Sequence, residues 1–358
     1  MSETSIEDMI FAELEGEMVG KPEPEVLIPE LEPEPEVVLS SGPVETSPCG
    51  KYTVQAKPFE EVFGWKPTHV PNFMVNVFTG YESNPVPDPY LPPKEQLEQF
   101  VFYAERQRKV NLVGPTGAGK TLMAEFYAAI TGRPFLRIEH NQELDKSTVF
   151  GQVHITNGDT DFVPGDLPLA MLDPTVVVLD ELTRAPGPAN MIYQRVFDRN
   201  EMYMPEMKGT GIKAITPHPQ FVICATDNTK GDGEDLDMYP ASNVQDAAFR
   251  NRFDALIEVP YATQAEEEAL CNHLLTVPVP PMVVKSLAQF SFLIHAGCAD
   301  RTISTAFSPR QLITICRDLN DGLTMKQSIT LCYINFCSKS EYSDILETYK
   351  TAFGEELI

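Results

Sequence analysis

The chain has 358 residues, 42% of them hydrophobic, and carries a formal net charge of −25 at pH 7. This length allows two domains and a tail. The acidic charge disfavours unassisted binding to nucleic acid because it repels phosphate backbones, although a ring could still hide a basic pore.

Cysteine usage and hydropathy indicate a cellular compartment. The seven cysteines contain no C-x-x-C pair, which is typical of thiols in a reducing cytosol. The first residues are acidic, whereas a signal peptide begins with a basic region. Since no apolar run approaches the length of a membrane span, we expect a soluble, cytoplasmic protein with no membrane segment.

The first fifty residues hold thirteen acidic side chains against one basic side chain, Lys21, and are rich in proline. Such a composition cannot bury enough apolar surface to offset ordering entropy, so residues 1–50 are predicted to form a disordered acidic tail. An alternative is a short helix that folds onto a partner. Its apolar residues at helical spacing would be Ile6, Met9, Ile10 and Leu14.

The next segment, 51–93, is Pro-rich and is expected to be irregular. Its density of aromatic residues nevertheless predicts that it packs onto a folded body. Residues 94–109 have the pattern of an amphipathic helix, and this helix leads into an apolar strand at 110–113.

That strand runs into GPTGAGKT, a full match to the phosphate-binding pattern G-x-x-x-x-G-K-[ST]. Its glycines let successive backbone N–H groups face a polyphosphate, and the helix that follows adds its positive dipole end. Lys120 is predicted to reach the β/γ-phosphates, and the Thr121 hydroxyl to ligate Mg²⁺. We expect ATP to be bound by Gly114, Pro115, Thr116, Gly117, Ala118, Gly119, Lys120 and Thr121.

A second motif follows a strand at 135–138 and a hairpin predicted around Asn157-Gly158. The apolar run 176–179 is typical of a strand buried on both faces, and it ends in two acids. Asp180 is predicted to hold Mg²⁺, and Glu181 to deprotonate the attacking water. A Gly-rich turn and two solvated carboxylates are the alternatives, and the two motifs together favour a nucleoside triphosphatase.

Three further positions complete the predicted site. Asn228 follows the strand 221–225, which is expected beside the Asp180 strand; there it would hold the attacking water, unless it only forms a turn. Arg252, supported by Arg250, is predicted to act on a neighbouring subunit's γ-phosphate. Alternatively, the two arginines pair with local acids such as Asp246 or Asp254.

Other elements predicted along this part are a helix at 187–199, a hairpin at 202–215 and a strand at 255–259. From residue 263 the pattern is helical, with a capping box at Thr263 and a helix start at Ser308-Pro309. Arg310 could reach the nucleotide from this helix. The predicted helices are 263–276, 281–297, 309–320, 324–337 and 340–353.

This order of motifs resembles the AAA+ ATPases, and within them the MoxR-type and chelatase motor subunits with a hairpin inserted in the second helix. DELTRAPG at 180–187 is similar to the MoxR pattern. The family of the cobaltochelatase ATPase subunit, CobS, is similar in four segments. They are FGWKPTHVPNF at 63–73, PHPQFVICATDNTKGDG at 217–233, FSPRQLI at 307–313 and YKTAFG at 349–354.

The resemblance implies an α/β fold: a parallel-sheet AAA+ core at 94–260 with the hairpin insertion, then a small all-helical lid at 261–358. Residues 51–93 would form a CobS-like N-terminal segment. The resemblance also implies a homo-oligomeric, hexameric ring with ATP between subunits, and a partner with a von Willebrand factor A-type (VWA) domain, like CobT. The client is left open.

Two other functions compete with this motor. A helicase or translocase would need a basic pore, for which Lys146, Lys208 and Lys213 are the sparse candidates. A nucleotide-gated scaffold would not need Glu181. Residues 149–151 could face a pore or, as we favour, pack in the core.

Overall fold

A computed structural model describes residues 41–47, 50–82, 84–142, 146–156, 159–186, 190–203, 214–230 and 242–357. The chain divides into two units, and the second, Leu39–Ile358, contains all of these residues. Residues 1–40 of the predicted tail, with its alternative helix, lie outside the described residues. At 44–46 the prediction of disorder is wrong, because these residues form a strand, β1 (Val44–Thr46), by pairing with a later strand.

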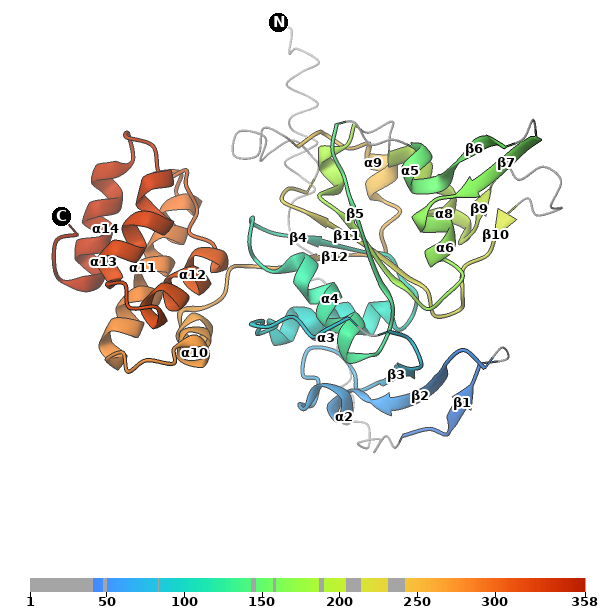
Figure 1. Ribbon diagram of the computed structural model, residues 1–358, viewed down its shortest axis with the longest axis horizontal. Coiled ribbons are helices and arrows are strands. Elements are labelled where there is room, and N and C mark those ends of the chain that lie inside the picture. Colours follow the sequence, from blue (N-terminus) through green and yellow to red (C-terminus); the bar gives the residue numbers. More distant parts are fainter. Residues whose placement is uncertain are drawn as a thin grey trace, which may run out of the picture. The chain divides into compact units, whose positions relative to one another are not determined.

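The core is a five-stranded sheet in the order β12-β4-β11-β8-β5 (Figure 1). All neighbouring strands are parallel. The three central strands, β4, β11 and β8, are buried along their whole length, as the continuous apolar run of β8 predicts for that strand. The strands are β4 (Val110–Val113), β5 (Phe135–Glu139), β8 (Val176–Asp180), β11 (Val222–Asp227) and β12 (Ala255–Glu258).

Alternate side chains of these strands enter two separate apolar clusters, one on each face of the sheet. Val176 and Val178 pack with α3 (Lys94–Ala104) and α4 (Lys120–Ile130). Val177 and Leu179 pack in the second cluster. Its helices are α5 (Lys146–Phe150), α6 (Asp166–Ala170), α8 (Gln194–Arg199) and the short helices η1 (Leu182–Arg184), η2 (Met191–Tyr193) and α9 (Ala247–Arg250).

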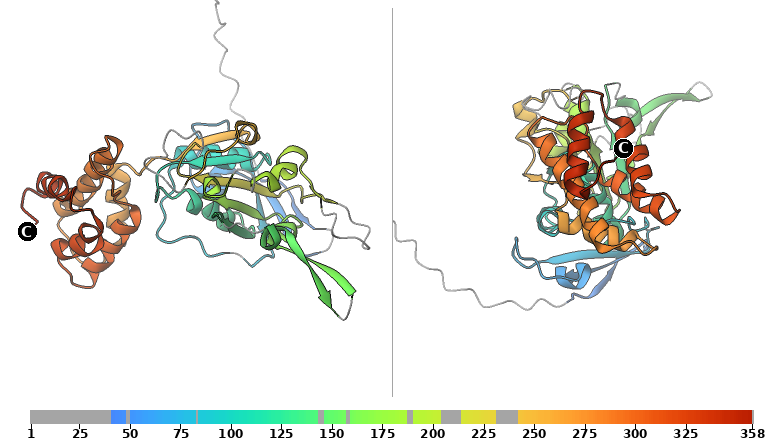
Figure 2. Two further views of the ribbon diagram at one scale, coloured as in Figure 1. Left: turned by 90° about the horizontal axis from the view of Figure 1, so that it is seen from above. Right: turned by 90° about the vertical axis from the view of Figure 1, so that its left-hand side faces the viewer.

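Two β-hairpins are inserted among the helices of this second cluster. β6 (Gly151–Thr156) pairs with β7 (Asp159–Pro164) between α5 and α6, and Figure 2 shows this hairpin projecting from the sheet's layers. β9 (Met202–Tyr203) pairs with β10 (Ala214–Ile215). Both predicted hairpins are therefore present, although Asn157, Gly158 and residues 204–213 lie outside the described residues. Val149 and Phe150 are buried in the core, as we favoured.

The segment before α3 differs from the prediction. The irregular chain expected at 51–93 contains two strands, β2 (Thr53–Pro58) and β3 (Met74–Thr79), joined by α2 (Phe59–Phe63). With β1 (Val44–Thr46) they form an antiparallel sheet. β2 and β3 pair with each other, and this pairing supplies their backbone hydrogen bonds. The prolines around the two strands made the segment look irregular in the sequence. The predicted packing is confirmed, because Phe59, Phe73 and Trp65 join the α3–α4 cluster.

The C-terminal helices have their own apolar core, with Phe290, Phe307, Tyr333 and Tyr349 at its centre. A capping box at Thr263 begins one helix, as predicted, and another helix begins after Ser308 with Pro309 in its first turn, as predicted; Ser308 also forms a capping box. The helices, seen end-on and side-on in Figure 2, are α10 (Gln264–Leu274), α11 (Pro281–Ala299), α12 (Pro309–Asn320), α13 (Met325–Cys332), η3 (Ile334–Phe336) and α14 (Tyr342–Phe353).

Helix α11 corrects one expectation. By length and composition its 19 residues could cross a membrane, although no apolar run of that kind was expected. Its buried side chains, among them Leu287, Phe290 and Ile294, lie in the core of the helical bundle. The apolar character of α11 therefore matches that of a core helix.

Candidate functional site

The loop between β4 and α4 owes its shape to three glycines. Gly117 and Gly119 have φ of +87° and +83°, in the left-handed region that L side chains rarely adopt. Gly114 has a different reason: a Cβ there would lie 2.1 Å from the carbonyl oxygen of Val259. The pattern that predicted phosphate binding thus also satisfies the backbone geometry of this turn.

Lys120 is enclosed by this loop and is only 7% exposed. Its Nζ donates to the carbonyl oxygens of Gly114 (2.7 Å) and Pro115 (2.8 Å) and to Asn228 Oδ1 (3.0 Å). Burial lowers the pKa of Lys120 to about 8, against the opposing effect of the nearby carboxylates of Asp227, Asp180 and Glu181. The loop lysine and the predicted Asn228 therefore meet at one place.

Asp180, at the end of β8, is 3% exposed and accepts hydrogen bonds from two hydroxyls. Thr121 Oγ1 lies 2.6 Å and Thr226 Oγ1 2.5 Å from Asp180 Oδ1. Burial alone would raise the pKa of Asp180, but these bonds and Arg137 outweigh it, so the pKa is lowered. The adjacent hydroxyl and carboxylate oxygens of Thr121 and Asp180 are a donor set that Mg²⁺ prefers.

Arg137 is a site residue that the sequence reasoning missed. It lies on β5, beside β8, and its Nε is 2.7 Å from Asp180 Oδ2. It also pairs with Glu139 at 3.0 Å. The signal available was an arginine inside a strand, FLRIE, next to the acidic strand.

Glu181 has a left-handed backbone with φ of +53°. A non-glycine residue in this region costs roughly 1–3 kcal/mol, and such strain concentrates at functional sites. Its backbone N–H donates to Thr226 Oγ1 at 3.2 Å, and its carboxylate pairs with Arg184 at 2.9 Å. The side chain is 33% exposed, so water can approach it.

Asp227, beside the predicted Asn228, was also missed. It is 1% exposed and accepts from the Thr183 backbone N–H at 2.6 Å and from Asn111 at 3.4 Å. Burial raises the pKa of Asp227 to about 7. Because β11 pairs with β8 as predicted, Asp227 ties the end of β11 to the turn after Glu181.

The two predicted arginines lie at α9 and in the turn after it. Arg252 Nε donates to Asp198 Oδ1 at 2.7 Å, and Arg250 NH1 to the Lys230 carbonyl at 3.5 Å. Their partners are therefore not Asp246 and Asp254. Asp246 caps α9 by accepting from the Ala248 N–H, and Asp254 accepts from the Lys109 N–H.

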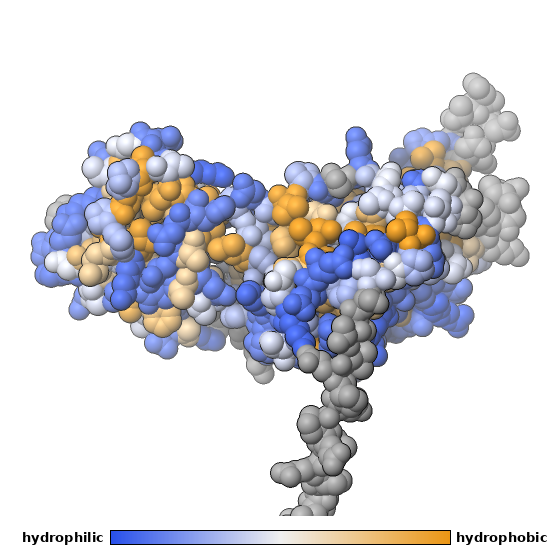
Figure 3. All heavy atoms as spheres, turned by 90° about the horizontal axis from the view of Figure 1, so that it is seen from below, coloured by the Kyte–Doolittle hydropathy of each residue, from blue (hydrophilic) through white to orange (hydrophobic). Residues whose placement is uncertain are grey.

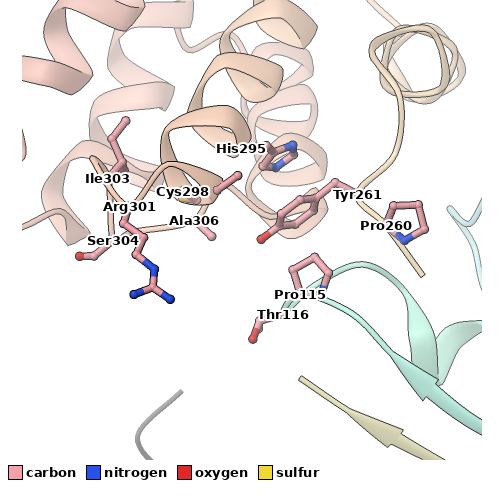
Figure 4. A pocket seen from close by; sticks show the side chains of 11 residues that line it. Pro115, Thr116, Pro260, Tyr261, His295, Cys298, Arg301, Ile303, Ser304 and Ala306 are labelled. Atoms are coloured by element: carbon pink, nitrogen blue, oxygen red, sulfur yellow. The ribbon is translucent and has the colours of Figure 1, made fainter. Parts of the chain in front are cut away.

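A cavity of about 700 Å³ adjoins the loop (Figure 4). Tyr261 and His295 stack in its wall with ring centroids 3.7 Å apart and planes 1° apart. This flat, mostly apolar wall next to the phosphate loop suits a nucleobase. The lining residues are Pro115, Thr116, Pro260, Tyr261, His295, Cys298, Ala299, Arg301, Ile303, Ser304 and Ala306.

The start of α12 also approaches the loop, since a Cβ on Gly117 would lie 2.7 Å from Ser308 Cβ. Arg310, two residues further along α12, is exposed. Arg301, by contrast, lines the cavity and was not predicted.

Comparison with known proteins places these features in a family. The model of the AAA domain (dynein-related subfamily) matches residues 109–253. Midasin of Dictyostelium discoideum is 34% identical over 184 residues, 51% of this chain but only 3% of midasin. The aerobic cobaltochelatase subunit CobS of a Sinorhizobium species is 24% identical over 276 residues, 75% of this chain and 82% of CobS.

Two further similarities cover other lengths. Protein NorQ of Paracoccus denitrificans is 27% identical over 139 residues, 39% of this chain and 50% of NorQ. Among solved structures, the R170A variant of Thermotoga maritima RuvB aligns with a TM-score of 0.45 and 14% identity, covering 75% of this chain and 84% of RuvB.

The resemblance stated from the sequence is thereby confirmed at the level of the family. The domain match spans the phosphate loop, the acidic strand and both arginines, on a parallel sheet with a helical C-terminal region. Residues 109–253 of this chain form an AAA+ ATPase domain, and the chain is similar to MoxR-like ATPases such as CobS and NorQ.

Proposed function

We propose that this chain binds ATP with Mg²⁺ at the loop Gly114–Thr121 and hydrolyses the γ-phosphate. The observation that carries the proposal is the convergence of Lys120, Thr121, Asp180 and Asn228 within hydrogen-bond distance at the carboxyl edge of the sheet. Mg²⁺ held by Thr121 and Asp180 would neutralise charge on the β- and γ-phosphates.

Each residue of the proposed site then has a role. Lys120 contributes a positive charge beside the phosphates, and backbone N–H groups of the glycine turn face them. Glu181 accepts a proton from the attacking water once its carboxylate leaves Arg184. Asn228, held by Lys120, orients that water or contacts the γ-phosphate.

The remaining positive charge is proposed to come from a neighbour in a hexameric ring. Arg252, with Arg250 in support, would stabilise transition-state charge on the adjoining subunit's γ-phosphate, an effect of about 10³–10⁵ in rate. Arg310 would contact the nucleotide from the helical lid. Exposed apolar side chains favour assembly, and in the C-terminal helices Met282 is 72% and Phe336 74% exposed. Figure 3 shows hydrophobic surface on both the helical part and the core.

We further propose a remodelling role with a VWA-domain partner in the cytoplasm. CobS is a cobaltochelatase subunit by name, and its alignment spans most of both chains, which supports this direction. We retain 94–260 as core and 261–358 as lid in this proposal. The client is a protein or metal-chelatase complex.

Two variants and one capture experiment test the proposal. Glu181→Gln should bind ATP normally and lose at least 100-fold in turnover, whereas Lys120→Ala should lose nucleotide binding itself. Turnover retained by Glu181→Gln would exclude Glu181 as the base. The Glu181→Gln protein, held with ATP, should then capture a VWA-domain protein from its native cell; capture of nucleic acid alone would refute the remodelling role.

A further inference from the structure

Four consecutive backbone carbonyls after Glu181 accept hydrogen bonds from amide side chains. Asn190 Nδ2 donates to the Leu182 carbonyl at 2.9 Å, and Gln245 Nε2 to the Ala185 carbonyl at 3.2 Å. Asn243 Nδ2 donates to the two carbonyls between them, those of Thr183 at 3.2 Å and Arg184 at 2.9 Å. We call Asn190, Asn243 and Gln245 the amide clamp.

The clamp is itself connected and mostly buried. Asn190 also donates to Gln245 Oε1 at 2.9 Å, and Gln245 to the Asn243 carbonyl at 3.3 Å. Asn190 is fully buried and Gln245 is 4% exposed. Because buried amides keep their hydrogen bonds, the turn after Glu181 and the segment around Asn243 are held as one unit.

That unit continues into the elements that hold the two arginines. Gln245 directly precedes Asp246, the cap of α9, on which Arg250 lies. Asn190 directly precedes η2 and α8, and α8 provides Asp198, the partner of Arg252. The rings of Phe249 and Phe253 pack against Phe197 of α8, with centroids 5.7 and 5.0 Å away.

We propose that the amide clamp positions Arg250 and Arg252 relative to the turn at Glu181. A movement of this turn, such as separation of Glu181 from Arg184, shifts the carbonyls that the clamp holds and thereby the arginine-bearing segments. The state of a subunit's own nucleotide site then sets how its arginines meet the next subunit. This inference rests on the proposed function, in which Arg252 acts on a neighbour.

Mixed rings can isolate this role. One subunit, the donor, carries Glu181→Gln, so it cannot hydrolyse ATP but still presents its arginines. The other, the acceptor, carries Arg252→Ala and keeps its own Glu181. Turnover in the mixture comes from acceptor sites that face a donor's arginines.

The clamp variant Asn243→Ala is then added to the donor only. Its amide is half-buried, so the fold should tolerate the loss; Asn243→Asp, which keeps the size but cannot donate, is the second variant. We expect rescued turnover to fall at least tenfold, with the donor's ATP affinity and melting temperature unchanged. Gln99→Ala in the donor removes an amide whose hydrogen bond among the described residues is to Glu95 on α3; this variant is the matched control and should leave rescue intact.

Unchanged rescue with both donor variants would overturn the inference. A clamp that only supported Glu181 would give this result, because the donor's Glu181 has already been replaced and does not contribute to turnover. A different result would mark failure of the proposed function itself. If unmodified donor and acceptor give no rescue, or Arg252→Ala alone keeps turnover, Arg252 does not act in trans and the inference falls with it.

Discussion

Arg133→Met should destabilise the protein strongly, because Arg133 is fully buried and paired with a buried carboxylate. Its NH2 lies 2.8 Å from Glu105 Oε1, and the Glu105 side chain is 3% exposed. Its NH1 donates to the Gln220 carbonyl at 2.7 Å. Glu105 also accepts from Tyr127 at 2.6 Å and from Asn76 at 2.7 Å, so this cluster joins β3, α3, α4 and the approach to β11.

The magnitude follows from these contacts. Removing one partner of a buried ion pair costs about 3–5 kcal/mol, since it leaves an uncompensated charge. The lost bond to the Gln220 carbonyl adds about 1 kcal/mol. Tyr127 and Asn76 still solvate the Glu105 carboxylate and offset part of this, so we expect a loss of about 3–5 kcal/mol in the free energy of unfolding.

Trp65 provides the assay, because it is the single tryptophan of the chain. Its indole N–H donates to the buried Glu98 at 2.9 Å, within the same layer, so its fluorescence should follow urea unfolding of this region. The double variant Arg133→Met/Glu105→Leu should recover most of the loss, since it removes both charges. A loss below about 1 kcal/mol for Arg133→Met, the size expected of an exposed ion pair, would refute the reasoning, as would a double variant no more stable than the single one.

Three more predictions concern titration and metal. Burial raises the pKa of Glu267 from 4.5 to about 7, so the folded state keeps a proton that the unfolded state has lost, and stability falls as pH rises through this window. Above pH 7, Glu267→Gln should therefore be more stable than the parent by up to about 3 kcal/mol in the free energy of unfolding. Urea unfolding at pH 5.5 and 8 measures this, and an equal pH dependence of variant and parent would contradict it. Because the pKa of Lys120 is lowered to about 8, ATP affinity measured by calorimetry should fall about tenfold per pH unit above that value, and Lys120→Arg should abolish the dependence. Arg137→Ala removes a cation from Asp180, so the Mg²⁺ concentration for half-maximal turnover should fall about three- to tenfold; an increase would show that Arg137 assists the metal site.

The sequence predicted which side chains meet at the carboxyl edge of the sheet, because the signals for this edge are local. The glycines of the loop are required by its backbone angles and by the close approach of Val259, so the motif and the geometry coincide. Asp180 ends a wholly apolar run, which predicts a buried strand. Asn228 followed from the same logic on the neighbouring strand.

What the sequence did not reveal depends on contacts between distant segments. The strands β2 and β3, which α2 connects in sequence, are stabilised by pairing with each other. The prolines of this segment had suggested an irregular chain. Arg137 reaches Asp180 only because β5 lies beside β8. Asp198, the partner of Arg252, is 54 residues away, whereas the acids nearest in sequence have other tasks.

The position of these arginines bears on how hydrolysis is organised. Lys120, Thr121 and Asp180 meet at one edge of the sheet, where the proposed function has them supply positive charge and metal ligands for bound phosphates. Arg252 instead points to Asp198 on α8. To reach the phosphate-binding loop of its own subunit, Arg252 would have to break its ion pair with Asp198. A γ-phosphate of a neighbouring subunit could compete with Asp198 for the Arg252 guanidinium, because a phosphate and a carboxylate bind the same planar fork. Replacing Asp198 by Asn should therefore release Arg252. We expect this variant to change the turnover of assembled rings and to leave the nucleotide affinity of single subunits unchanged.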